Sequence, residues 1–180
     1  MRPLPPGAVD YPAATYRYGS TRSGTLRPHH GIDFENPQGT LVLAAGRGAV
    51  VFADNDRADQ LGPTTSFYGN VVVVQLHQAY LYQPVYVLYG HLATITVRRG
   101  DWVEAGAQLG TVGGTGIARG GTHLHCNCGE VAIQHINRLV KVGLMQLHDD
   151  NIAVEACGRP ELVGTIIARK DYSTAPGSQH

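Results

Sequence analysis

Short apolar runs separated by glycine turns are the feature that most limits the folds open to this chain. From residue 41 to residue 126, runs rich in valine, leucine and alanine follow one another, with turns such as RRGD and EAG between them. The runs are LVLAA (41–45), GAVVFA (48–53), NVVVVQL (70–76), VYVLYGHL (85–92), TITV (94–97), QLGTVG (108–113) and THLHC (122–126). Runs this short, without a long helical pattern between them, predict an all-β domain built mainly of antiparallel sheets. The four valines at 71–74 predict a strand in the middle of a sheet that is covered on both faces.

Proline content and the periodicity of apolar residues divide the chain into three segments. Residues 1–28 are rich in proline and lack apolar periodicity, so we expect an irregular lead-in. Residues 29–130 carry the strand pattern and form the predicted β domain, and residues 131–180 form a C-terminal extension. Apolar residues recur in that extension at helical spacing, which predicts a short helix, and the small polar residues after 172 predict a disordered tail. The helical positions are Ile133, Ile136, Val140 and Leu144.

Length and charge narrow the class of protein. A chain of 180 residues is long enough for one domain with a buried core. Its 14 basic and 14 acidic residues cancel, so we expect no nucleic-acid partner and no anionic membrane surface. No apolar run approaches the roughly 20 residues that span a bilayer, and the first residues lack the pattern of a secretory signal. We expect a monomer without a membrane span, and a processed chain would also begin without its export signal.

Five of the nine histidines lie in three short motifs. In His29-His30-Gly31-Ile32-Asp33, positions i and i+4 share one face of a strand or a helix, so His29 and Asp33 can converge on one ion. A neutral imidazole and a carboxylate are both good zinc donors. The motif is nonetheless short, and such a pair is also common on protein surfaces.

The second motif, His123-Leu124-His125, follows a glycine-rich approach and begins a predicted strand. Residues i and i+2 lie on one strand face, so both imidazoles point into the same space. By the same alternation Cys126 and Cys128 point away from it, as small buried residues would. Zinc sites built on cysteine usually space the thiolates by two to four residues and add a second pair, which this chain lacks.

The third motif is Tyr89-Gly90-His91-Leu92, at the end of an otherwise apolar run. A buried histidine needs hydrogen-bond partners, so its presence there indicates a role. A catalytic zinc ion generally has three protein ligands and one open position. Five candidates for three places leave two side chains free to act on the substrate.

Together these phrases resemble the lysostaphin/LytM-type zinc endopeptidases that act on peptidoglycan. The resemblance covers about residues 28–127. It rests on HHGIDF, PQGTLVLAAGRGAVVFAD, YGNVVVVQLH, VYVLYGHL, VRRGDWVEAGAQLGTVGGTG and THLH, in that order. It implies a β-sheet groove of the barrel-sandwich kind and cleavage of peptide cross-links in the bacterial cell wall. That function implies in turn an extracellular or cell-envelope location.

Carried onto this chain, the resemblance implies one zinc ion per chain held by His29, Asp33 and His125. It implies that His91 and His123 assist the chemistry, one accepting a proton from the attacking water and the other donating a hydrogen bond to the oxyanion or a proton to the leaving amine. The family usually continues after the second histidine of the HxH motif with an aromatic residue and a glutamate. This chain has Cys126 and Asn127 there.

Three rival interpretations remain beside this one. Relatives that keep the fold and lose ligands act as non-catalytic regulators of other wall hydrolases, although this chain keeps all five motif residues. A zinc peptidase acting on a peptide outside the wall would show the same motifs. The stretch GDWVEAGAQLG also resembles biotinyl and lipoyl carrier domains, but those need a lysine on a hairpin. The lysines here, Lys141 and Lys170, lie outside the β pattern.

Overall fold

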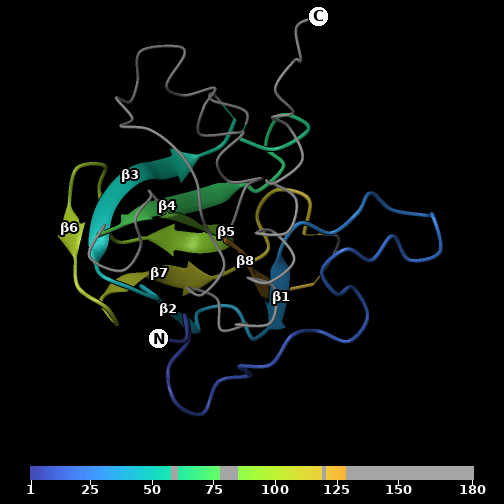
Figure 1. Ribbon diagram of the computed structural model, residues 1–180, viewed down its shortest axis with the longest axis horizontal. Coiled ribbons are helices and arrows are strands. Elements are labelled where there is room, and N and C mark those ends of the chain that lie inside the picture. The colour runs from blue at the N-terminus through green and yellow to red at the C-terminus, as the bar shows by residue number, and fades with distance from the viewer. Residues whose placement is uncertain (58–60, 78–84, 119–120, 129–180) are drawn as a thin grey trace, which may run out of the picture.

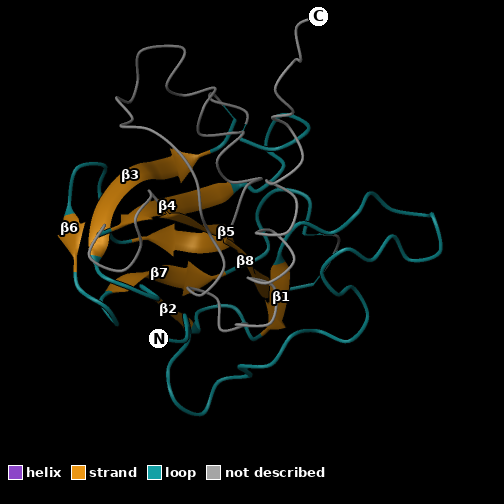
Figure 2. Cartoon of the chain, in the orientation of Figure 1, coloured by secondary structure: helices purple, strands orange, loops and turns teal. Residues whose placement is uncertain are grey.

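The described part of the chain is an all-β domain. The structure is a computed structural model that describes residues 1–57, 61–77, 85–118 and 121–128. Within these ranges it contains strands and loops, and no helix that could cross a membrane (Figure 2). The strands are β1 (Ile32–Glu35), β2 (Leu41–Leu43), β3 (Gly48–Asn55), β4 (Asn70–Leu76), β5 (Val85–Ile95), β6 (Trp102–Val103), β7 (Gln108–Val112) and β8 (His123–Cys128). The predicted all-β, antiparallel fold class is confirmed.

All eight strands join one antiparallel sheet, in the order β1-β8-β5-β4-β3-β6, with β7 pairing β2 and β5 (Figure 1). The central strand β4 carries the valine run, and Val71, Val72, Val73 and Val74 are fully buried. Val72 and Val74 belong to a larger core cluster, whereas Val71 and Val73 belong to a smaller one. The valine strand is therefore covered on both faces, as its sequence predicts.

The two core clusters lie on opposite faces of the sheet around β5 and β8. Leu124 and Cys126 of β8 and Phe34 of β1 pack in the larger cluster. Leu88 of β5 packs in the smaller cluster, and its partner across the ladder is Asn127. Because side chains alternate along a strand, His123 and His125 share the face of Asn127 and point away from the larger cluster. We call this the histidine face.

Strand β1 is an end strand of the sheet, and the N-terminal segment runs along its outer edge (Figure 1). The amide of Ala13 donates to the carbonyl of Asp33, and the amide of Gly19 donates to the carbonyl of His29. The amide and carbonyl of Val9 both bond the side chain of Asn36. As residue numbers increase along the segment, the residue numbers of their hydrogen-bond partners decrease, so the segment lies antiparallel to β1.

Most strand positions agree with the predictions, and three details differ. The run at 85–92 and the first two residues of the run at 94–97 form one strand, β5, which is irregular at His91. Strands β1 and β6 were not among the predicted strands, because β1 has four residues and β6 only two. The helix, the tail and the other predictions for 131–180 lie outside the described residues.

Candidate metal centre

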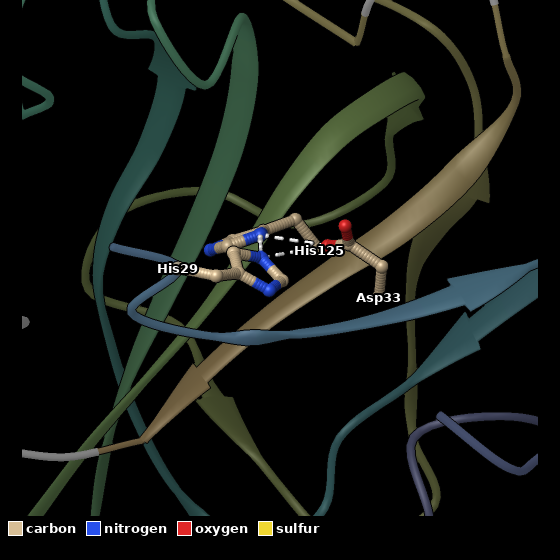
Figure 3. A group of neighbouring side chains, drawn as sticks. All are labelled: His29, Asp33 and His125. Atoms are coloured by element: carbon tan, nitrogen blue, oxygen red, sulfur yellow. Dashed lines mark hydrogen bonds and ion pairs between the residues drawn. The ribbon is translucent and has the colours of Figure 1, made fainter. Parts of the chain in front are cut away.

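Pairing of β1 with β8 brings the first and second histidine motifs together. Asp33 faces His125 across the ladder, and Glu35 faces His123. Oδ1 of Asp33 lies 2.9 Å from Nδ1 of His125 and 3.3 Å from Nε2 of His29. The two imidazole nitrogens lie 3.2 Å apart, so three donor atoms close a triangle (Figure 3). Residues that are 96 positions apart in the chain thus meet at one point.

The proton on His29 is fixed by its surroundings. Nδ1 of His29 lies 2.8 Å from the carbonyl oxygen of Tyr16, and a carbonyl only accepts hydrogen bonds, so Nδ1 carries the proton. The ring of Tyr16 stacks on the imidazole, with centroids 4.2 Å apart, and holds its plane. In the neutral ring, Nε2 then carries no proton, and its lone pair points at the carboxylate oxygen of Asp33. That contact is favourable only when a cation lies between the two atoms or the ring is protonated.

The triangle has the dimensions of a zinc site. Zinc bonds of about 2.0–2.2 Å at tetrahedral angles place two ligand atoms roughly 3.3–3.6 Å apart. The observed separations of 2.9, 3.2 and 3.3 Å are close to that range. His29, Asp33 and His125 are also a group among the described residues whose donor atoms all lie within 4.8 Å of one another. The residues therefore fit a zinc ion.

Protonation states at neutral pH favour the same interpretation. Burial lowers the pKa of His125 more than its hydrogen bond to Asp33 raises it, so the ring is neutral. Burial would raise the pKa of Asp33, but its contacts with His125 and His29 together hold that pKa well below its ordinary value. The pair is thus a neutral imidazole beside a carboxylate, which is the form in which both residues bind zinc.

The other two predicted site residues lie beside this triangle. Nε2 of His123 is 3.7 Å from Oδ1 of Asp33. The ring of His91 lies edge-on to that of His123, with centroids 4.8 Å apart, and 5.8 Å from that of His125. All five predicted residues therefore come together on the histidine face.

His91 reaches this face only because β5 is irregular. Strict alternation would place His91 with Tyr89, which is buried in the larger core cluster. Between Val72 and Asn70 the register of β4 against β5 shifts, and His91 has a φ of 62°. A bulge of this kind re-aims one side chain. Nδ1 of His91 lies 2.8 Å from the carbonyl of Thr115 and donates to it, which leaves Nε2 without a proton in the neutral ring.

Burial also sets the charge of His91. It lowers the pKa of His91 to about 3, and the neighbouring rings of His125 and His123 act in the same direction. His91 is therefore neutral at pH 7 and offers a proton acceptor at Nε2.

Tyr68 and Asp56 also shape the site, and neither was among the site residues predicted from the sequence. Tyr68 covers His125, with ring centroids 5.2 Å apart. Both backbone amides of Tyr68 and Gly69 donate to the buried carboxylate of Asp56. The residues Tyr68-Gly69-Asn70 directly precede the valine run, but no local sequence pattern indicates that they fold next to the histidines. Asn127, where the family usually has glutamate, is buried on the histidine face, and Cys126 packs in the larger core cluster.

Two imidazoles and a carboxylate on an antiparallel sheet, with two more histidines beside them, match the donor set of catalytic zinc sites and form a candidate metal centre. Residues 27–138 match Peptidase family M23, and the chain belongs to that family. The resemblance stated from the histidine motifs is therefore confirmed.

Three proteins illustrate how similar this chain is to other proteins in sequence and structure. Peptidoglycan DD-endopeptidase ShyA of Vibrio cholerae is 37% identical over 100 residues, which is 56% of this chain but 20% of ShyA. The catalytic domain of the prophage-encoded M23 protein EnpA from Enterococcus faecalis is 26% identical with a TM-score of 0.51, over 63% of this chain and 76% of that one. The antimicrobial peptidase lysostaphin of Staphylococcus simulans is 25% identical with a TM-score of 0.50, over 65% of this chain and 41% of that one. The chain thus spans about a fifth of the length of the curated relative.

Proposed function

We propose that this chain is a zinc-dependent endopeptidase that hydrolyses peptide cross-links of bacterial peptidoglycan at the cell envelope. The observation that supports it most is the triangle formed by His29 Nε2, Asp33 Oδ1 and His125 Nδ1, with separations of 2.9–3.3 Å. Membership of Peptidase family M23 and similarity to a peptidoglycan DD-endopeptidase support the peptide substrate.

In this proposal His29, Asp33 and His125 hold one zinc ion per chain. When bound, zinc supplies Lewis acidity toward water and toward a scissile carbonyl group. The surrounding residues orient its ligands: the carbonyl of Tyr16 fixes the tautomer of His29, and Tyr68 lies against the ring of His125.

His91 and His123 act on the attacking water and on the leaving amine. Neutral His91 accepts a hydrogen bond from the attacking water at Nε2 and orients it, because Nδ1 is committed to the carbonyl of Thr115. His123 lies on the exposed side of the triangle, next to Glu35, and passes a proton to the leaving amine. Attack of the water oxygen on the carbonyl carbon and departure of the amine then leave one carboxylate and one amine as products.

The test is cleavage of isolated, cross-linked wall peptides by the purified chain. We expect new amine and carboxyl ends by mass spectrometry, loss of cleavage with a zinc chelator, and recovery when zinc is restored. A chain that binds zinc and leaves wall peptides intact while cutting another peptide would contradict the substrate. A chain that binds zinc and cuts neither would contradict the enzyme and favour a regulator that binds other wall hydrolases.

A further inference from the structure

Glu35 occupies a position on the histidine face that the metal triangle does not use. Side chains two residues apart on a strand share a face, about 7 Å apart, so Glu35 points to the same side as Asp33. Its partner across the ladder is His123, and paired side chains of this kind begin about 5 Å apart. The carboxylate thus lies one step along the sheet from the proposed proton donor.

A groove continues this face beyond the edge of β1. It is lined by Val9, Tyr11, Ala13, Ala14, Thr15 and Glu35. The amide of Ala13 donates to the carbonyl of Asp33, which holds this part of the N-terminal segment against β1. Tyr11 of that segment and Glu35 of β1 line the same groove. Because the carboxylate of Glu35 lies on the histidine face, the groove begins at the edge of that face.

The carboxylate of Glu35 is exposed and has no partner in the part of the chain that the structure describes. The nearby carboxylate of Asp10, in contrast, is paired with Arg2. No lysine or arginine is among the residues that line the groove, and two of them are alanines, which leave room. Tyr11 is 66% exposed and offers its ring beside the free negative charge. An acidic group and an aromatic face together are suited to an ammonium ion.

We propose that Glu35 and Tyr11 form a subsite for a free side-chain ammonium group of the peptide substrate. An extended peptide advances about 3.5 Å per residue, so the ammonium belongs to a diamino acid within about two residues of the scissile bond. The inference rests on the proposed function, because it places this group beside the hydrolytic site.

The experiment uses two synthetic peptides of one sequence, with a diamino acid next to the scissile bond. Its side-chain amine is free in one peptide and acetylated in the other. We expect the unaltered chain, loaded with zinc, to prefer the free amine by roughly tenfold in kcat/KM, the size of a partly exposed ion pair with a cation–π contact. Glu35→Gln should bring this ratio close to one, and Tyr11→Leu should lower it by roughly twofold to fivefold.

Glu104→Gln is the matched control, because Glu104 is also exposed but lies beside Trp102 on another part of the sheet. It should keep the ratio of the unaltered chain. Equal preference for both peptides in the unaltered chain, or a ratio that Glu35→Gln leaves unchanged, would overturn the subsite. An equal fall in kcat on both peptides in Glu35→Gln would also overturn it, since Glu35 would then act through His123.

Binding separates this inference from the proposed function. The same two peptides with an N-methylated scissile amide are titrated into each variant by calorimetry. If neither parent peptide is cut, but the free-amine analogue binds about tenfold more tightly than the acetylated one and Glu35→Gln removes the difference, the endopeptidase proposal fails and the subsite stands. Absence of binding by both analogues, or equal binding, overturns the subsite.

Discussion

Nε2 of His29 lies 3.3 Å from Oδ1 of Asp33, although the proton of the neutral ring is on the opposite nitrogen. Two lone pairs repel at this distance unless a positive charge lies between them or on the ring. The carbonyl of Tyr16 maintains this arrangement from outside the triangle. The contact is therefore what we expect of residues that bind a cation between them, and the proposed zinc site predicts how the neighbouring residues behave.

His91 and His123 should be separable from the metal ligands by experiment. His91→Asn and His123→Ala should keep about one zinc per chain and lower kcat by roughly 10²–10⁴, the range for lost acid–base assistance. Asparagine is chosen at 91 because it tolerates the left-handed backbone found there. Zinc content and kcat are measured on the same preparations. Full activity in either variant would remove that residue from the mechanism, and loss of zinc would make it a ligand.

Gly31 should be indispensable for the position of His125. A Cβ atom at Gly31 would lie 2.4 Å from Cε1 of His125 and 2.9 Å from the carbonyl oxygen of Cys126. Gly31→Ala should therefore displace the ring and weaken zinc binding by about 10- to 100-fold, the range for disturbing a group that orients a ligand. Gly121→Ala is the control, because a Cβ there meets nothing within 4 Å. Unchanged zinc affinity in a folded Gly31→Ala protein would show that His125 is not held in this way.

The metal-free protein should lose stability as the pH falls below about 6.5. Burial lowers the pKa of His91 to about 3 from its ordinary value of 6.5, so between these pH values the unfolded chain binds a proton at His91 and the folded chain does not. The contribution of His91 to the free energy of unfolding is complete above pH 6.5. It declines as the pH falls, by about 2 kcal/mol at pH 5. His125, whose pKa is also lowered, acts in the same direction.

Asp33 does not obscure this effect. Its pKa is lowered, so its contribution is complete above its ordinary value of 3.8 and is lost only as the pH falls below that value. Urea unfolding at pH 7 and pH 5 measures the change, and His91→Asn should reduce it. Equal stability of the unaltered metal-free protein at both pH values would mean that His91 and His125 remain accessible to protons.

The strands could be predicted because the apolar composition of each run indicates how far its side chains are buried. A run such as Val71–Val74, between Gly69-Asn70 and Gln75, has few alternatives to a central strand, and all four valine side chains are buried. Strand β6 was not predicted, because two residues carry no periodicity. The face of His91 was also beyond prediction, since a bulge and a left-handed residue reverse the alternation on which such reasoning depends.

The candidate site was predictable to the extent that its residues lie in short motifs. His29 with Asp33, and His123 with His125, are brought to one face by local spacing. The contribution of Tyr16, Tyr68 and Glu35 depends on which segments pair, and pairing joins residues such as Asp33 and His125 that are 92 positions apart. No local pattern contains that information.

Zinc content of single variants shows whether His29, Asp33 and His125 hold the metal. The purified chain should hold about one zinc ion after dialysis, and His29→Ala, Asp33→Ala and His125→Ala should each hold close to none. His30→Ala is the control, because His30 is adjacent to His29 but exposed, and it should keep the full amount. Elemental analysis, with circular dichroism to show folding, gives the answer. Retention of zinc by folded His29→Ala and His125→Ala proteins would contradict the account.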